Sequence, residues 1–559
     1  MWLFRVFIVF LIPTAALLGQ LTTEQKLADF HYLAGLYAKN YGPYEWKRDV
    51  INFDLLDTGR WVAKVSETKT DLAFFDVMSE YVASLNDAHD VYTLPSNFVA
   101  RLNFAVDIYE GRLYVDFIDR SRLPAAEFPF QIGYELVSID GVDAQRIVER
   151  YLRYGIAAND KSTRRISASL VTTRPQQLIP SAPEVPEVST VVFRRPDGNL
   201  VSHRIPWSRS GLALTSVGRY PSVKSTPRVA GEEEPDYLQV LRRLQNCRLP
   251  DRSVLNFGSR TPIFVNSMGF GFTRRLGGAT DDVFYSGVFV FGSYKIGYIR
   301  IPNFSPANVT AALTQFLTEI TYFQSNTDGL VVDVMRNPGG SVDYTNQLLS
   351  LLIPSKWNSV GFEVRATSNW VVSISSALES AKAQSAPAQI IALFEELKKQ
   401  LVTANSELRG RTKPIPLDDL TIERDPAMDS RGTVIAYKKP LMLLVDEMSA
   451  SAADMFSATI QDNKRGVLFG WRTMGAGGNV EDWQAGSYSD GVTSITESLM
   501  SRSQEVRTRD FPVTHYVENV GVRPDIEFDY MTYENLIRGG TPFVESFVLA
   551  MYYQIQANK

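Results

Sequence analysis

The sequence is poor in cysteine and histidine, which excludes several kinds of chemistry. Cys247 is the single cysteine, so no disulfide can form within the chain and no cysteine cluster can hold a metal ion. The four histidines, His31, His89, His203 and His515, lie far apart and match no metal-ligand spacing such as HExxH. We therefore expect neither a metal ion nor any other cofactor in the mechanism.

A large charge of either sign is also lacking. The formal net charge is -5 over 559 residues, and the chain contains no basic run. This balance argues against nucleic acid and against a membrane surface as partners. Hydrophobic residues make up 45% and charged residues 21%, which is typical of a globular protein with a large core. A chain of this length has room for about three to four domains.

Long hydrophobic runs are confined to the first residues. Arg5 precedes an apolar stretch at residues 6–12, and small residues follow up to Gly19. This layout is typical of a cleaved export signal. A membrane anchor is the alternative, but a membrane span needs about 20 apolar residues. We expect residues 1–19 to be a signal peptide, and the protein to be exported, periplasmic or secreted, with no stable membrane span after cleavage.

The spacing of apolar residues divides the first 210 residues into two parts. Apolar side chains recur at helical spacing between residues 22 and 94. The pattern then predicts a hairpin around Glu110 and Gly111, a strand, turn and helix around Gly141, and a second hairpin around Gly198. This order resembles a PDZ-like module. We expect an N-terminal helical domain at residues 20–98 and a PDZ-like domain at residues 99–210.

From residue 285 onward, short runs rich in Val, Ile and Leu alternate with helical stretches. The alternation predicts a largely parallel sheet with crossover helices, and so an α/β core at residues 285–535 of a multidomain α+β protein. A helical insertion is expected near residues 375–408 and a C-terminal helix at residues 536–559. Residues 211–284 show few periodic segments and are expected to form an insertion or linker.

The segment LVDEMSASAADMF, residues 444–456, places Ser449 and Ser451 between a buried-strand pattern and a helical one. A serine on such a turn projects above the end of the sheet, where the helix N-terminus directs backbone N–H groups toward it. The simplest alternative is that one serine only caps the helix. The local pattern does not choose between the two serines.

Three other segments contain groups that a serine nucleophile requires. In DVMRNPGGSVD, Gly339 and Gly340 expose backbone N–H groups that can face an oxyanion. LNDAHD ends the N-terminal helices with His89, and HYVENVGVRPDIEFD contains Glu518. A serine hydroxyl needs a positioned base, histidine suits that task near neutral pH, and a carboxylate can orient the ring.

The chain resembles the S41 serine peptidases, which include the tail-specific and tricorn-core proteases. The resemblance rests on five segments in the family's order: LNDAHD, IGYELVSIDG, VVDVMRNPGGSV, SASAADMF and VENVGVRPDIE. The resemblance covers most of the chain and implies a crotonase/ClpP-like α/β protease core of the tricorn type. It implies that Ser451, rather than Ser449, is the nucleophile. It further implies that His89 is the base and that Glu518 is the carboxylate that orients it. The implied oxyanion donors are the backbone amides of Gly339, Gly340 and Ala452.

The sequence departs from the tail-specific pattern at the position of the catalytic lysine. In those enzymes a GKG motif supplies the base, whereas this chain has Gly475, Ala476 and Gly477. The glutamine that accompanies that lysine is replaced by Val480. Lys464 lies at the far end of the expected helix, about 20 Å from the serine at a rise of about 1.5 Å per residue. The resemblance therefore implies a Ser-His-Glu mechanism of the tricorn type.

Several alternatives remain open at this point. His515 competes with His89 because it lies three residues before Glu518. A serine–lysine peptidase that recruits another lysine is a second alternative. A catalytically silent tricorn-core protein that binds peptides or ligands is a third. The hypothesis we favour is an exported serine endopeptidase with protein or peptide substrates as partners. A homodimer is a further possibility that the sequence does not decide.

Overall fold

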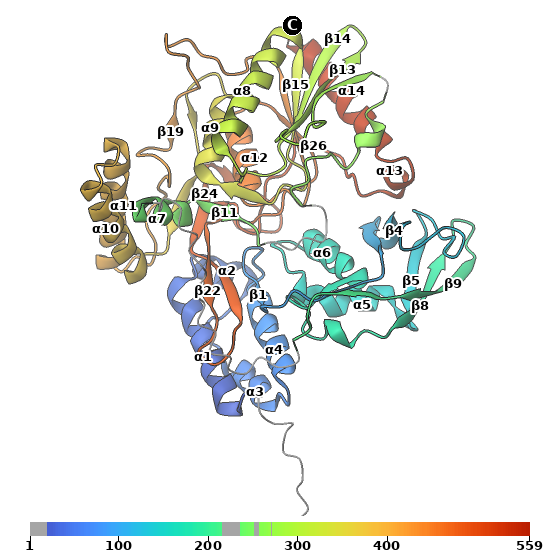
Figure 1. The fold of residues 1–559 in the computed structure, drawn as a ribbon. Coiled ribbons are helices and arrows are strands. Elements are labelled where there is room, and N and C mark those ends of the chain that lie inside the picture. Colours follow the sequence, from blue (N-terminus) through green and yellow to red (C-terminus); the bar gives the residue numbers. More distant parts are fainter. Residues whose placement is uncertain (1–19, 215–234, 251–256, 270, 559) are drawn as a thin grey trace, which may run out of the picture.

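The computed structural model describes residues 20–214, 235–250, 257–269 and 271–558 (Figure 1). The expected signal peptide, residues 1–19, lies outside the described residues. Within these ranges no helix is long and apolar enough to cross a membrane. Figure 1 shows a large sheet-containing body, a helical lobe in blue and a teal lobe rich in strands.

The N-terminal lobe is helical, as its apolar periodicity predicts. Thr22 and Gln25 form a capping box that starts the first helix, and the buried face of that helix includes Phe30 and Leu33. A short strand of this lobe pairs with a hairpin from much later in the chain, so the lobe is joined to the C-terminal half. These elements are α1 (Thr23–Asn40), α2 (Tyr44–Ile51), α3 (Gly59–Glu67), α4 (Asp71–Ala83) and β1 (Tyr92–Thr93), with β22 (Val480–Gln484) and β23 (Val492–Thr496) as the hairpin.

The second lobe contains both hairpins that the sequence predicts. Its main sheet has the order β3-β4-β5-β8-β9, and two helices pack against it. The second helix, α6, was not evident in the sequence pattern because it is buried on nearly all sides and lacks an exposed polar face. The elements are β2 (Val99–Arg101), β3 (Phe104–Tyr109), β4 (Arg112–Ile118), β5 (Glu135–Ile139), β6 (Val142–Asp143), α5 (Ala144–Tyr151), η1 (Leu152–Tyr154), α6 (Asp160–Thr172), β7 (Thr173–Pro175), η2 (Ala182–Glu184), β8 (Val188–Arg194), β9 (Leu200–Pro206) and β10 (Ser208–Ser210).

The core sheet has seven strands in the order β12-β13-β14-β15-β20-β21-β26. The pairs from β14 to β26 are parallel, as the alternation of strands and helices predicts, and β12 and β13 add an antiparallel edge. The strands are β12 (Phe272–Leu276), β13 (Tyr285–Phe291), β14 (Tyr294–Arg300), β15 (Gly329–Asp333), β20 (Leu441–Val445), β21 (Val467–Gly470) and β26 (Ile526–Glu527).

Alternate residues of the central strands enter two different apolar cores. Leu443 packs into a core with helices α8, α9 and α12, whereas Leu444 packs into one with α14. Helices therefore cover both faces of the sheet, which explains the continuous apolar runs of its strands. These helices and the short α13 are α8 (Val309–Asn326), α9 (Val342–Ser350), α12 (Ala452–Asp462), α13 (Tyr533–Ile537) and α14 (Thr541–Ala557).

The two expected insertions differ in structure. The helical insertion near residues 375–408 forms an antiparallel pair of helices, visible beside α7 in Figure 1. The described part of residues 211–284 contains a helix, a short strand and a strand of the core sheet, so it is more ordered than its sequence pattern indicates. The remaining elements are α7 (Asp236–Leu244), β11 (Asn246–Arg248), η3 (Val265–Ser267), β16 (Gly339–Ser341), β17 (Trp357–Asn358), β18 (Gly361–Val364), α10 (Ser368–Ala383), α11 (Ala388–Ser406), β19 (Glu423–Arg424), β24 (Ser498–Val506) and β25 (Thr514–Tyr516).

Candidate active site

Ser451 lies on the turn between β20 and α12, at the carboxyl end of the parallel sheet. Its backbone has φ 61° and ψ -114°, a strained conformation for a residue with a side chain. Asp454 stabilises this turn by accepting hydrogen bonds from the amides of Ser451 (2.7 Å) and Ala476 (3.1 Å) and from the Thr473 hydroxyl. Burial raises the pKa of Asp454 to about 6, and these hydrogen bonds oppose the rise.

The hydroxyl of Ser449 has a different role. It donates to the backbone oxygen of Val334 at 2.8 Å, and it accepts from the amide of Asp446 at 3.1 Å. Ser449 thus joins the nucleophile turn to the end of β15, and its oxygen is engaged by the fold. Of the two serines, only Ser451 directs its hydroxyl toward a base.

His89 reaches Ser451 from the loop that follows α4. The ring Nε2 lies 2.7 Å from Ser451 Oγ, although the two residues are 362 positions apart. The loop is fixed because the His89 amide donates to Asp87 (3.0 Å), and because the hydroxyl of Ser494 on β23 donates to the His89 carbonyl (2.5 Å). Both His89 and Ser451 are fully buried. The structure brings the expected base and nucleophile within hydrogen-bond distance.

The Pro-Gly-Gly turn lies beside the serine, as its place after the neighbouring strand β15 requires. Gly339 (φ 90°) and Gly340 (φ 152°) both have backbone conformations that side chains rarely adopt. A Cβ on Gly339 would lie 2.8 Å from the Ala452 amide nitrogen and 2.8 Å from Ser451 Cβ. The Gly339 amide donates to the side chain of Asn337 at 2.9 Å. Of the three expected oxyanion donors, Gly339 is therefore already engaged by a side chain.

Glu518 is buried in the same region. Its carboxylate accepts a hydrogen bond from the Gly477 amide at 2.9 Å and forms an ion pair with Lys47. Burial and the nearby Asp87 raise the pKa of Glu518 to about 8, although Lys47 opposes the rise. The expected role of Glu518 in orienting His89 remains a prediction, because these described contacts are with Lys47 and Gly477.

The competing residues lie elsewhere or lack the required chemistry. His515 is exposed on β25 and faces the carbonyl of Arg502, with its ring Nδ1 3.1 Å from that oxygen. Lys464 is exposed at the end of α12. Ala476 stands in the loop that Asp454 holds, and it cannot accept a proton. Among the described residues, no group of histidine, cysteine and acidic side chains could hold a metal ion.

The short strand β11 covers the edge of β16, which carries Gly339 and Gly340. Cys247 pairs with Gly340, and the amide of Leu249 donates to Pro338 at 2.9 Å. Because hydrogen-bonded positions alternate along an antiparallel ladder, Cys247 and Gly340 form a hydrogen-bonded pair. The other edge of β16 is bonded to Phe304. Nothing in the sequence pattern indicated this pairing.

The strand-rich lobe contacts the nucleophile turn directly. The hydroxyl of Ser162 on α6 donates to the carbonyl of Glu447 at 2.6 Å, four residues before Ser451. Arg165 on the same helix binds Glu447 (2.8 Å) and Asp107 on the outer strand β3 (2.5 Å), and all three side chains are buried. This arrangement favours a supporting role for the lobe over capture of a peptide along β3.

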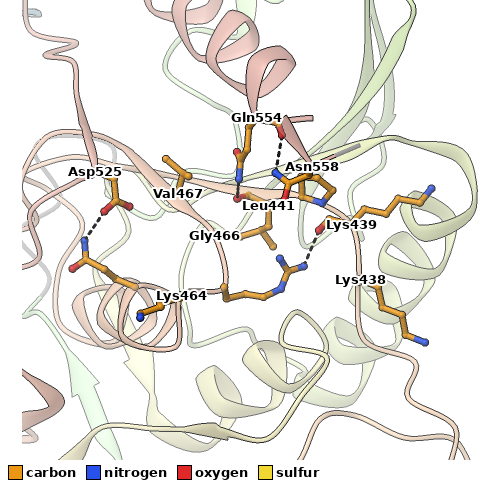
Figure 2. Close-up of a pocket in the computed structure, with 12 residues that line it drawn as sticks. Lys438, Lys439, Leu441, Lys464, Gly466, Val467, Asp525, Gln554 and Asn558 are labelled. Atoms are coloured by element: carbon orange, nitrogen blue, oxygen red, sulfur yellow. Dashed lines mark hydrogen bonds between the residues drawn. The ribbon is translucent and has the colours of Figure 1, made fainter. Parts of the chain in front are cut away.

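A separate hollow of about 520 Å³ lies at the opposite edge of the sheet, where β20 and β21 begin (Figure 2). Its cationic lining residues are Lys438, Lys439, Lys464 and Arg465, and Asp525 is the single acid. Figure 2 shows the side chains of Lys438 and Lys439 pointing away from Lys464, so the three ammonium groups do not converge on one point. Its lining includes no serine, cysteine or histidine.

Comparisons with known proteins found two matching family models and relatives in Chlamydia. The model of peptidase family S41 matches residues 295–528, and a PDZ domain model matches residues 99–215. A protein of Chlamydia trachomatis serovar D is 24% identical over 586 residues, covering 94% of this chain and 92% of its own length. A Chlamydia pneumoniae protein is 23% identical, covering 96% of this chain and 92% of its own length.

A solved structure supports the fold over nearly the whole chain. The structure of mature CPAF, the Chlamydia protease-like activity factor, complexed with lactacystin matches with a TM-score of 0.74 at 23% identity. The match covers 96% of this chain and 99% of that chain. The expected S41 resemblance and the expected fold class are confirmed, and the second lobe is a PDZ domain. The chain contains a serine peptidase domain of family S41 at residues 295–528.

Proposed function

We propose that the protein is an endopeptidase whose catalytic residues are Ser451, His89 and Glu518. The observation that carries this proposal is the 2.7 Å separation between Ser451 Oγ and His89 Nε2 in a buried site. A serine hydroxyl becomes a useful nucleophile when an adjacent base can accept its proton. The strained turn of Ser451 and the fixed loop of His89 hold the two atoms in that relation.

In the proposed reaction, Ser451 Oγ forms a bond to the scissile carbonyl carbon while His89 Nε2 takes the hydroxyl proton. When the tetrahedral intermediate collapses, the carbon–nitrogen bond breaks and His89 gives the proton to the leaving amine. A water molecule then releases the acyl group by the same steps in reverse order. The anion of Glu518 stabilises the positive charge that His89 carries between these transfers.

The amides of Gly340 and Ala452 are proposed to stabilise the oxyanion of the intermediate. Ala452 follows Ser451 at the N-terminus of α12, which adds a positive potential at this point. Gly340 follows Gly339, where an added Cβ would lie 2.8 Å from Ser451 Cβ. The loss of one such donor typically lowers the rate by about 10²- to 10³-fold. Gly340 cannot gain a side chain without distortion, because a Cβ would lie 2.2 Å from a backbone carbon of Phe304.

The alternative is a silent tricorn-core protein that binds peptides. A fluorophosphonate probe discriminates between the two, because it reacts only with an activated serine. We expect the wild-type protein to be labelled at Ser451 and to cleave casein. A folded protein that neither reacts with the probe nor cleaves casein, even after β11 is displaced, would favour the silent alternative.

We further propose that β11 restrains the enzyme. An extended substrate would pair with β16 at the edge that β11 occupies, because Phe304 takes the other edge. A Cβ on Gly339 would lie only 2.4 Å from the carbonyl oxygen of Cys247, which places that carbonyl close to the Ser451 turn. The chain thus places one of its own carbonyls where a substrate carbonyl is required.

Displacement of β11 should raise activity. Cys247→Pro removes the amide hydrogen that this ladder position requires, so we expect kcat/KM toward a peptide substrate to rise about tenfold, equivalent to about 1.4 kcal/mol. Cys247→Ala is the matched control, because it keeps the backbone hydrogen bonds and should leave the strand in place. Equal rates for Cys247→Pro and the wild type would exclude a restraining role for β11.

Export is proposed from the sequence of residues 1–19. Mature protein recovered outside the cytoplasm should begin near Gln20, as determined by mass spectrometry of the intact chain. Phe10→Asp interrupts the apolar stretch with a charge, so we expect it to retain the uncleaved precursor inside the cell. Secretion of the Phe10→Asp variant with its first residues intact would contradict the proposal.

A further inference from the structure

Lys47 on α2 is shielded from solvent although it carries a charge. Its side chain is fully buried, which is unusual because an ammonium group loses its hydration unless partners replace it. Three acceptors surround the ammonium nitrogen: the carboxylate of Glu518, the backbone oxygen of Asn86 (2.8 Å) and the side-chain oxygen of Asn519 (2.8 Å). An ammonium group has three hydrogens, so its donors are all used.

These acceptors belong to the two loops that bring the proposed base and acid together. Asn86 lies three residues before His89, and Asn519 follows Glu518 directly. The side-chain nitrogen of Asn519 also donates to the Asn86 oxygen at 3.0 Å. Asn86 (φ 49°) and Asn519 (φ 62°) both have left-handed backbone conformations, so each loop turns sharply at its contact with Lys47. Lys47 therefore connects the base-bearing loop to the acid-bearing loop.

The surroundings of Lys47 are rich in acidic groups. Glu518, Asp87 and Asp90 are all buried here, and Tyr41 donates a hydrogen bond to Asp87 at 2.9 Å. His89 lies on the same loop as the two aspartates, and Thr496 on β23 donates its hydroxyl to Asp87 and its amide to Asp90. Burial raises the pKa of Asp90 well above its usual value, and Asp87 adds to this effect. Lys47 lowers the pKa of both Glu518 and Asp90.

We infer that Lys47 is a positioning residue that favours the ionised form of Glu518 and fixes this side chain beside the His89 loop, so that Glu518 can support the histidine during catalysis. The inference rests on the proposed catalytic residues. Because its three donors are engaged by Glu518, Asn86 and Asn519, Lys47 does not serve as the base that a serine–lysine peptidase would need. Its contribution is made through Glu518.

The test is the pH profile of Lys47→Met, a variant of similar length without the charge. Loss of the opposite charge of Lys47 should raise the pKa of Glu518 by about one pH unit or more. We expect kcat of the variant at pH 7 to be about tenfold or more below that of the wild type, with little change in KM. The difference in kcat should become smaller at pH 9–9.5, where Glu518 of the variant also ionises. A loss that is constant across pH, or no loss, would overturn the inference.

Lys47→Met leaves a buried carboxylate without its cation, so this variant can fail to fold. The pair Glu518→Gln and Lys47→Met/Glu518→Gln avoids that problem, because the double variant contains neither charge. If Lys47 acts through Glu518, the second substitution should change kcat less than threefold relative to Glu518→Gln. A further tenfold loss would show that Lys47 acts independently and would refute the inference.

Two results separate this inference from the proposed function. If Ser451→Ala and His89→Ala abolish activity while Lys47→Met retains the wild-type pH profile, the role of Lys47 is wrong and the peptidase proposal stands. If Ser451→Ala retains full activity, the catalytic assignment fails, and the role proposed for Lys47 fails with it. Labelling by the fluorophosphonate probe at pH 7 and pH 9 gives a second measurement of the same pH dependence.

Discussion

Ser451→Ala should abolish hydrolysis and labelling by a fluorophosphonate probe. We expect kcat toward a peptide substrate to fall by about 10⁴- to 10⁶-fold, because the covalent route disappears while substrate binding and the oxyanion donors remain. The protein should keep its fold, since the Ser451 amide, which Asp454 binds, is unchanged. The measurement is single-substrate kinetics together with the melting temperature of each variant.

Ser449→Ala is the matched control for this prediction. Ser449 is equally buried and lies two residues away, but its hydroxyl binds Val334 and Asp446 rather than His89. Its loss should lower stability by about 1–3 kcal/mol, because buried groups of the backbone lose their partner. Labelling at Ser451 should persist. Activity that depends on Ser449 and survives Ser451→Ala would reverse the assignment of the nucleophile.

The sequence predicts the core because its strands are buried on both faces. The runs around Val331, Leu443 and Leu468 are apolar throughout, and each is followed by a turn at the same edge of the sheet. Parallel neighbours β15 and β20 place Gly339 and Ser451 side by side for this reason. The active-site corner is thus a consequence of strand order, which local patterns and turn residues can indicate.

Other features depend on contacts that no local pattern specifies. Lys47 stands in a helix whose sequence resembles an exposed amphipathic helix, and only the tertiary structure shows that its ammonium group is buried. The pairing of Cys247 with Gly340 joins segments about 90 residues apart and involves a strand of three residues. The hydrogen bond from Gly339 to Asn337 depends on one side-chain conformation. Periodicity contains no information on any of these.

The proposed base and nucleophile are 362 positions apart in the chain, so the proposed activity depends on how the lobes meet. His89 follows the N-terminal helices, Ser451 belongs to the core, and Lys47 binds the loops that connect them. The hairpin β22–β23 pairs with β1 and holds the His89 loop through Ser494. A change that separates the N-terminal lobe from this hairpin would move the base away from the serine without altering either residue.

His89→Ala should lower kcat by about 10⁴-fold, because serine and base act as a unit and no other side chain of the turn can replace the ring. His515→Ala is the matched control. That ring is exposed on β25 and contacts the carbonyl oxygen of Arg502 rather than Ser451. Its loss should therefore change kcat less than about twofold. The reverse result, with His515 essential and His89 dispensable, would mean that the 2.7 Å contact between His89 and Ser451 is structural and that the base reaches the serine from the other side of the site.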